Sequence, residues 1–289
     1  MGCLALHLLT GSALVETAHG KKACDYPSLP NRNAGGITRF LAFGDSGTGA
    51  PAQYRLATQM EMTRKITGSR TALMLGDNLY PQGDVKALES RFLRPYSELL
   101  KSRVKFYPVL GNHDLEGDHG RGQMAYFGMP GRWYAILDGP TEFFMLDSNR
   151  TQVNYEQLNW LNDALSSSSA PWKVVATHHP IYSSGKSGSA WWMKIFVEPM
   201  LVKYKADIVL SAHDHHYERI KSQRGVNYFV SGGGGGGVRP VAHPEPFSEV
   251  ALATPHFLVF ELGQNKGWFQ AVNLCGRVID RGVLRSKNG

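Results

Sequence analysis

An apolar run that predicts a buried strand passes directly into polar residues in Ala72-Leu73-Met74-Leu75-Gly76-Asp77-Asn78-Leu79-Tyr80. The pattern recurs four times. Further buried strands are predicted at residues 40–43, 106–110, 174–176 and 208–210. The polar blocks that follow them are Gly44-Asp45, Gly111-Asn112-His113-Asp114, His178-His179 and His213-Asp214-His215. Because parallel strands can gather their carboxyl ends along one edge of a sheet, we expect these potential ligands to meet and hold two metal ions.

Helical and strand-like segments alternate from Ile37 onward, which predicts an α/β domain over residues 37–289. Helices are expected at residues 51–67, 85–93 and 155–165. A strand at 227–231 is followed by six glycines, 232–237, which either approach a ligand closely or form a flexible loop. Three successive strands, at 256–262, 268–273 and 278–284, form a terminal meander.

The composition limits the classes of partner. The 289 residues carry a net charge of +7, which favours an anionic small molecule such as a phosphate ester, although a basic surface without a ligand fits equally. The chain has no Lys/Arg block and no aromatic RNA-binding signature, so we expect no nucleic-acid-binding module. No obligate protein partner is indicated.

Residues 1–20 include an apolar stretch that is too short to span a bilayer and is similar to the core of a signal peptide. We therefore expect no transmembrane segment, a possible signal peptide at 1–20, an N-terminal arm at 21–36, and a secreted or periplasmic protein. A misread start of the chain or a frayed N-terminus is the alternative. Cys24 and Cys275 either pair, tying the arm to the last strands, or remain free thiols.

The five blocks are weak signals singly but specific as a set. Their order is Gly-Asp-Ser-Gly, Gly-Asp-Asn-Leu-Tyr, Gly-Asn-His-Asp, Thr-His-His-Pro and Ala-His-Asp-His. This order resembles the calcineurin-like metallophosphoesterase superfamily, over roughly residues 38–262. Tyr80, three residues after Asp77, narrows the resemblance to the purple acid phosphatases, especially the small tartrate-resistant type. The resemblance implies a four-layer sandwich in which helices flank two central mixed β-sheets.

The resemblance also implies a binuclear metal centre. The first ion would be bound by Asp45, Asp77, Tyr80 and His215. The second would share Asp77 and use Asn112, His178 and His213. A phenolate favours a trivalent ion, so we expect Fe(III) at the first position and Fe(II), Zn or Mn at the second. Such a centre would make the chain a phosphoric ester hydrolase, in which metal-bound hydroxide attacks a phosphomonoester and no protein nucleophile is required.

Several other residues are expected near the substrate. By family likeness, His113 contacts the phosphate or assists the leaving group, and Asp114 orients its ring by accepting a ring N–H. His179 lies beside a ligand or faces the substrate, and Asn112 can bind the phosphate. Lys186 either binds phosphate oxygens or is an ordinary solvated lysine. In the His-x-His block an extended backbone would turn both imidazoles to one side, so Asp214 should point away and be structural.

The chain departs from the family pattern at two positions. Ala212 stands where a Gly is usual before the His-x-His block. Ser187 stands roughly where purple acid phosphatases commonly carry a His that protonates the leaving alcohol. That role passes to His113, His179, Lys186 or a metal-bound water, or it is lost. Two alternative functions therefore stay open: a phosphodiesterase or nucleotidase that uses the same site, and a non-catalytic metal- or phosphate-binding relative.

Overall fold

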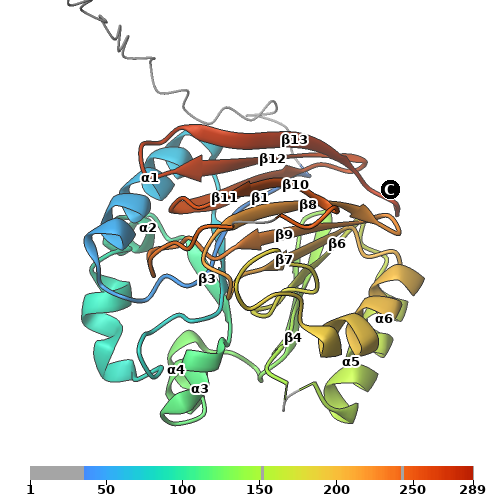
Figure 1. The fold of residues 1–289 in the computed structure, drawn as a ribbon, viewed down its shortest axis with the longest axis horizontal. Helices are drawn as coiled ribbons and strands as arrows, with labels where there is room; N and C mark the ends of the chain where they lie inside the picture. The colour runs from blue at the N-terminus through green and yellow to red at the C-terminus, as the bar shows by residue number, and fades with distance from the viewer. Residues whose placement is uncertain (1–35, 151–152, 242–243, 289) are drawn as a thin grey trace, which may run out of the picture.

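The computed structural model describes residues 36–150, 153–241 and 244–288 (Figure 1). The predicted signal peptide, nearly all of the predicted arm, and Cys24 lie outside the described residues. Cys275 is exposed. No helix in the described part of the chain is long and apolar enough to cross a bilayer.

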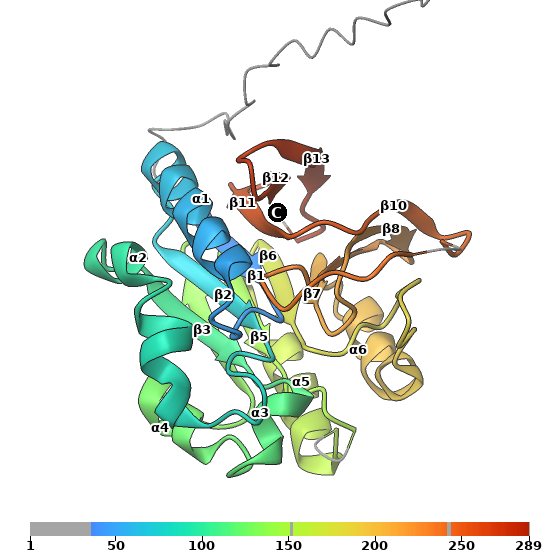
Figure 2. The ribbon, with the colours of Figure 1, turned by 60° about the vertical axis from the view of Figure 1, so that its left-hand side comes forward.

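Two mixed β-sheets form the centre of the molecule (Figures 1 and 2). The first contains, in spatial order, β13 (Val278–Arg285), β12 (Lys266–Asn273), β11 (His256–Leu262), β1 (Thr38–Phe43), β2 (Thr71–Leu75) and β3 (Lys105–Val109). The second contains β10 (Ser248–Leu252), β8 (Tyr217–Gln223), β9 (Val226–Ser231), β7 (Ile208–Ser211), β6 (Trp172–Ala176), β5 (Thr141–Met145) and β4 (Tyr134–Asp138). Strands β1, β2 and β3 are parallel, as are β5, β6, β7 and β9.

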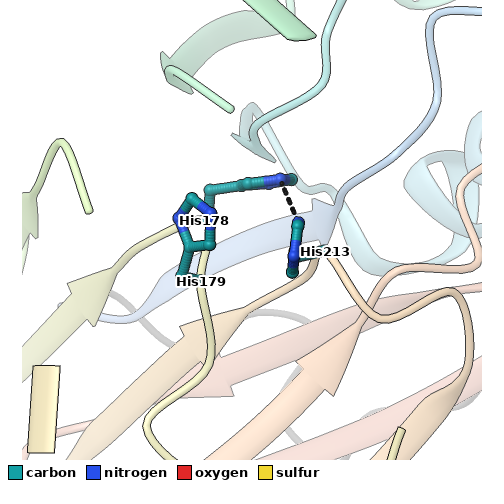
Figure 3. A group of neighbouring side chains, drawn as sticks. All are labelled: His178, His179 and His213. Carbon is teal, nitrogen blue, oxygen red and sulfur yellow. Dashed lines mark hydrogen bonds between the residues drawn. The ribbon is translucent and has the colours of Figure 1, made fainter. Parts of the chain in front are cut away.

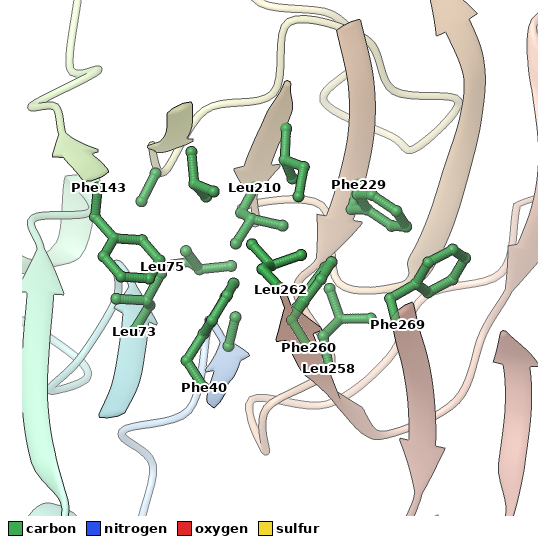
Figure 4. Close-up of a cluster of buried hydrophobic side chains, with 14 of the residues drawn as sticks. Phe40, Leu73, Leu75, Phe143, Leu210, Phe229, Leu258, Phe260, Leu262 and Phe269 are labelled. Atoms are coloured by element: carbon green, nitrogen blue, oxygen red, sulfur yellow. The ribbon is translucent and has the colours of Figure 1, made fainter. Parts of the chain in front are cut away.

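The main hydrophobic core fills the space between the two sheets (Figure 4). Phe40 and Phe260 stack in it with ring centroids 4.9 Å apart, and Phe143 meets Phe40 edge-on at 4.9 Å. Side chains alternate along a strand, so the intervening Leu41 and Phe43 belong to a second cluster on the outer face of the first sheet. Burial of both faces explains why β1 is apolar from Phe40 to Phe43.

Helices cover the outer faces of both sheets. On the first sheet lie α1 (Pro51–Thr67) and α2 (Ser97–Lys101), and on the second lie α5 (Tyr155–Ser167) and α6 (Glu198–Lys203). Further helical segments include α3 (Asn112–Glu116), α4 (Arg121–Phe127) and η3 (Met193–Val197). The predicted four layers and the predicted terminal meander are confirmed.

One helix prediction is wrong. The segment expected as a single helix at 85–93 is a 3₁₀ turn, η1 (Val85–Ala87), followed by a π turn, η2 (Glu89–Leu93). The Asp84 side chain accepts from Lys86 N at 2.9 Å and closes the first turn separately. In the second turn Phe92 is buried between Tyr96 and Phe106, so packing overrides regular helical geometry.

Four strands were missed: β4, β5, β8 and β10. Strand β4 lies at a sheet edge, where Leu137 is exposed and the apolar signal is mixed. Strand β3 also lies at an edge, which explains how it accommodates Pro108, a residue with no backbone N–H to donate.

Candidate metal centre

The predicted ligands follow the carboxyl ends of β1, β2, β3, β6 and β7; Asn112 is the first residue of α3, and the others lie in loops. Three of them adopt a left-handed backbone conformation: φ is 55° at Asp45, 51° at Asp77 and 68° at His213. This region is unfavourable for residues other than glycine, and such strain clusters at functional sites. The extended backbone expected for the His-x-His block is therefore wrong, although both imidazoles still reach the centre.

The first predicted set converges around the Tyr80 hydroxyl. The Tyr80 hydroxyl donates to Asp45 Oδ1 at 3.0 Å and lies 3.2 Å from His215 Nε2. His215 Nε2 is also 3.2 Å from Asp45 Oδ1. Burial, followed by the nearby carboxylates of Asp45 and Asp77, raises the pKa of the Tyr80 phenol far above its usual value. Without a cation this phenol is neutral.

The second predicted set converges around His178 Nε2. Asn112 Oδ1 and His213 Nδ1 each lie 3.1 Å from that nitrogen. Figure 3 shows His178 and His213 approaching each other, with His179 beside them. Burial lowers the pKa of His178 well below its usual value and also lowers that of His213. The imidazoles are therefore neutral, the form that binds metal ions.

In this second set two acceptor atoms face each other. His178 Nδ1 lies 2.9 Å from the carbonyl oxygen of Leu75, which can only accept, so Nδ1 carries the proton and Nε2 presents a lone pair. The amide oxygen of Asn112 is likewise an acceptor. Two acceptors 3.1 Å apart have no hydrogen between them, which is an arrangement that a cation resolves. The residues therefore fit a bound metal ion.

Asp77 lies between the two sets. Its Oδ1 is 3.5 Å from His178 Nε2 and accepts from His113 N at 3.0 Å. Burial, then the charges of Asp45 and Asp114, raise its pKa well above the usual range, because carboxylates crowd together without a cation. Gly111 permits this approach, since an added Cβ there would lie 2.1 Å from Asp77 Oδ1.

Glycines also allow the loop that follows β9 to approach the centre closely. Gly232 to Gly235 are buried, which favours the close-approach interpretation of the glycine run over the flexible loop. A Cβ added at Gly232 would lie 2.8 Å from Asp45 Oδ2, and Gly236 N donates to Asp45 O at 2.7 Å. A Cβ added at Gly44 would lie only 2.3 Å from the Cβ of Ala212. Because Gly44 has no side chain, the chain accommodates Ala212.

The sequence reasoning missed Ser148. Its Oγ accepts from His178 N at 3.0 Å and from His179 N at 2.8 Å, and lies 3.2 Å from His179 Nδ1. The signal was present, because Asp147-Ser148-Asn149 follows β5 in the same way that the other polar blocks follow their strands. Burial, followed by its neighbours His178 and His213, lowers the pKa of His179 to about 2.

The prediction that Asp114 orients His113 is wrong. Asp114 is buried and instead accepts from the backbone N–H groups of Asn78, Leu79 and Gly111 at 2.9–3.1 Å. It thereby shapes the loop that carries Asp77 and Tyr80. The ring of His113 is held by the carbonyl oxygen of Pro81, 2.7 Å from Nδ1, and its Nε2 lies 4.0 Å from Asp77 Oδ2.

Asp214 anchors the loop at 183–189, which agrees with the structural role predicted for that residue. Asp214 accepts from Ser183 Oγ at 2.6 Å and from Ser187 N at 2.8 Å. Glu218, also buried, accepts from Ser184 N at 2.8 Å. Lys186 is exposed and forms no ion pair with any described residue. The loop is thus anchored by two carboxylates but offers no imidazole.

Comparison with known proteins gives the family. Residues 38–217 match the calcineurin-like phosphoesterases. The chain belongs to this family. A calcineurin-like relative, the tartrate-resistant acid phosphatase type 5 of Oryctolagus cuniculus, is 28% identical over 236 residues, which cover 68% of this chain and 72% of the relative.

Two solved structures share the calcineurin-like fold. GAP50, described as the anchor in the inner membrane complex of Plasmodium, is 23% identical, with a TM-score of 0.78 over 87% of this chain and 89% of its own. Purple acid phosphatase from yellow lupin seeds is 18% identical, with a TM-score of 0.75 over 90% of this chain and 55% of its own.

The predicted family and hydrolase class are confirmed. The purple acid phosphatase relatives imply a binuclear metal centre in calcineurin-like enzymes of this branch. Two overlapping groups of described residues can hold metal ions: Asp45, Asp77 and His178, and His178, His179 and His213.

Proposed function

We propose that this chain is a binuclear metal-dependent phosphatase that hydrolyses phosphomonoesters. The observation that carries the proposal is the contact between Asn112 Oδ1 and His178 Nε2, two acceptors 3.1 Å apart with no proton between them. The first set, around Tyr80, is acidic and lies against the same Asp77. Support for the reaction class comes from the acid phosphatase relatives.

The two sets suit different ions. Asp45, Asp77, Tyr80 and His215 would hold an ion of high charge, because only such a charge offsets a phenolate buried beside two carboxylates. We therefore propose Fe(III) there. The neutral donors Asn112, His178 and His213, together with Asp77, would hold Fe(II), Zn or Mn. When bound, two such ions supply polarisation of the phosphoryl group and lower the pKa of bound water.

His179 is proposed to donate a hydrogen bond to a phosphoryl oxygen. Ser148 Oγ already accepts from two backbone N–H groups, so its own proton goes to His179 Nδ1 at 3.2 Å. The proton of the neutral imidazole then resides on Nε2. This places a fixed donor beside His213, whose ring centroid is 4.4 Å from that of His179.

His113 is proposed to serve the leaving group. Its Nδ1 is engaged by Pro81 O, which leaves Nε2 free on the side of Asp77. The 183–189 loop supplies no imidazole, so protonation of the leaving alcohol falls to His113 or to water. Asn112 would also contact the phosphate, and Lys186 would add an exposed positive charge.

The test is metal analysis combined with a visible spectrum. We expect two ions per chain and a tyrosinate-to-iron band that disappears in Tyr80→Phe. We also expect faster turnover of a mono-aryl phosphate than of a bis-aryl phosphate. An iron-loaded protein without the band would contradict the ferric site, and preference for the bis-aryl ester would instead favour the phosphodiesterase or nucleotidase alternative.

A non-catalytic metal-binding protein is the second candidate. It is favoured by the missing loop imidazole, and the related fold of GAP50 belongs to a protein described as an anchor. Hydrolysis that is equal in wild type and Asp77→Asn would support it, because any activity would then come from a contaminant.

A further inference from the structure

A cavity of about 590 Å³ lies at the end of the sheets opposite the metal centre. It opens beside Thr71 and Lys105, the first residues of β2 and β3, whereas the metal centre follows the last residues of these strands. Its volume is within the range of small-molecule sites. The described residues that line it are Arg64, Arg70, Thr71, Ser102, Arg103, Lys105, Tyr107, Ile136, Leu137 and Asp138.

Part of the cavity lining is strongly basic. Arg64 is neutralised by Glu61, which accepts from its Nε at 2.6 Å and its Nη2 at 2.9 Å. Arg70, Arg103 and Lys105 are exposed and form no ion pair within the described part of the chain. Of the described lining residues only Asp138 is a carboxylate, and it already accepts from Thr71 Oγ1 at 3.1 Å. An excess of positive charge remains.

Other lining residues are apolar. Tyr107 and Ile136 are half-buried and pack against the core between the two sheets. Leu137 is 69% exposed on the edge strand β4, which makes it a large apolar side chain facing solvent. A simple inorganic anion would use only the basic residues, whereas an organic anion would use both kinds.

We propose that this cavity binds an organic phosphate of nucleotide size. The phosphates bind Arg70, Arg103 and Lys105. Arg70 precedes β2, Arg103 lies in the turn before β3, and Lys105 begins β3. These residues therefore approach the anion from separate segments. The apolar part of the ligand packs against Tyr107 and Leu137. This site is separate from the metal centre and needs no metal ion.

Calorimetry with the β,γ-methylene analogue of ATP, which resists hydrolysis, tests the proposal on the metal-loaded protein. The variant Arg70→Ala/Arg103→Ala removes two cavity cations. Its control, Arg55→Ala/Lys221→Ala, removes two exposed cations elsewhere and lowers the net charge equally. We expect the cavity variant alone to lose one equivalent of binding, with affinity at that site falling at least about tenfold. All three proteins should hydrolyse a mono-aryl phosphate at the same rate.

Identical stoichiometry and affinity in the cavity variant and the control would overturn the site. A second comparison tests the organic part of the ligand. The ATP analogue should bind the cavity several-fold more tightly than inorganic tripolyphosphate, and Leu137→Ser should reduce that advantage. Because Leu137 is exposed, this variant should fold normally. Equal affinity of the two probes for the wild-type cavity would overturn an organic ligand.

Discussion

The two halves of the metal centre differ in how their atoms are satisfied without a cation. Around Tyr80, the phenol supplies a proton to Asp45 Oδ1 at 3.0 Å, so this half is a self-contained hydrogen-bonded group. Around His178, the Nε2 and Asn112 Oδ1 face each other at 3.1 Å as two acceptors. The first half must release a proton to bind an ion, whereas in the second the two facing acceptors can take up an ion directly.

The halves also differ in charge. The Tyr80 half contains carboxylates and a phenol whose pKa is raised by burial and by those carboxylates. The donors particular to the His178 half are two imidazoles and an amide, all neutral. This contrast predicts that the first half selects the ion of higher charge and that the two ions can be removed separately.

The largest effect should come from the residue that the halves share. Asp77→Asn should lower kcat/KM of mono-aryl phosphate hydrolysis by at least about 10³-fold, because several kcal/mol of charge stabilisation depends on both ions. Metal analysis should find less of both ions. Asp84→Asn, an exposed aspartate in the same loop region, is the control and should keep full activity. Retention of both ions in Asp77→Asn would contradict its bridging position.

Two single-half variants test whether the ions separate. Tyr80→Phe should abolish the visible band and keep the divalent ion, whereas Asn112→Ala should keep the band and lose the divalent ion. Each should reduce turnover by about 10²-fold, which corresponds to about 2.7 kcal/mol. Loss of both ions in both variants, measured by elemental analysis, would mean that the two halves bind metal only together.

The sequence predicted the members of each half better than their arrangement. Apolar runs followed by polar blocks gave the positions after β1, β2, β3, β6 and β7, because burial of a strand leaves a clear pattern. The left-handed conformation of His213 left no such pattern, and it replaced the extended segment expected there. Asp114 was assigned to His113 because the two are adjacent, whereas its buried carboxylate serves the backbone of another loop.

Ser148 supports the His178 half from behind, and its removal should have a smaller effect. Ser148→Ala frees His179 Nδ1 and removes the acceptor of two backbone N–H groups. We expect kcat/KM to fall about tenfold, the lower end of losses for residues that orient ligands. Nitrogen NMR should detect a change in the His179 tautomer. Ser211→Ala is the matched control, because among the described residues its buried hydroxyl bonds a single backbone carbonyl, Phe229 O, at 2.9 Å. An unchanged tautomer in Ser148→Ala would contradict the proposed orientation.

His256 is a buried imidazole outside both halves and can be compared with His178. Its Nδ1 lies 2.8 Å from Thr254 O, much as His178 Nδ1 lies against Leu75 O, but its Nε2 meets no hydrogen-bond partner in the described chain. Burial lowers its pKa to about 4, below the value of about 6.5 expected for the unfolded chain. As the pH falls below 6.5, the imidazole binds a proton in the unfolded state but not in the folded state, so the free energy of unfolding decreases.

The variant His256→Gln should remove this acid sensitivity without changing turnover. Between pH 7 and pH 6 the wild type should lose roughly 0.7 kcal/mol more of its free energy of unfolding than the variant, measured by urea denaturation of the metal-loaded protein. His119→Gln, at an exposed histidine, should retain the wild-type pH dependence. If His256→Gln also retains it, the buried imidazole binds a proton as readily in the folded chain as in the unfolded chain. Burial would then not keep an imidazole neutral in this protein, and the same argument would fail for His178, whose lone pair meets Asn112 Oδ1.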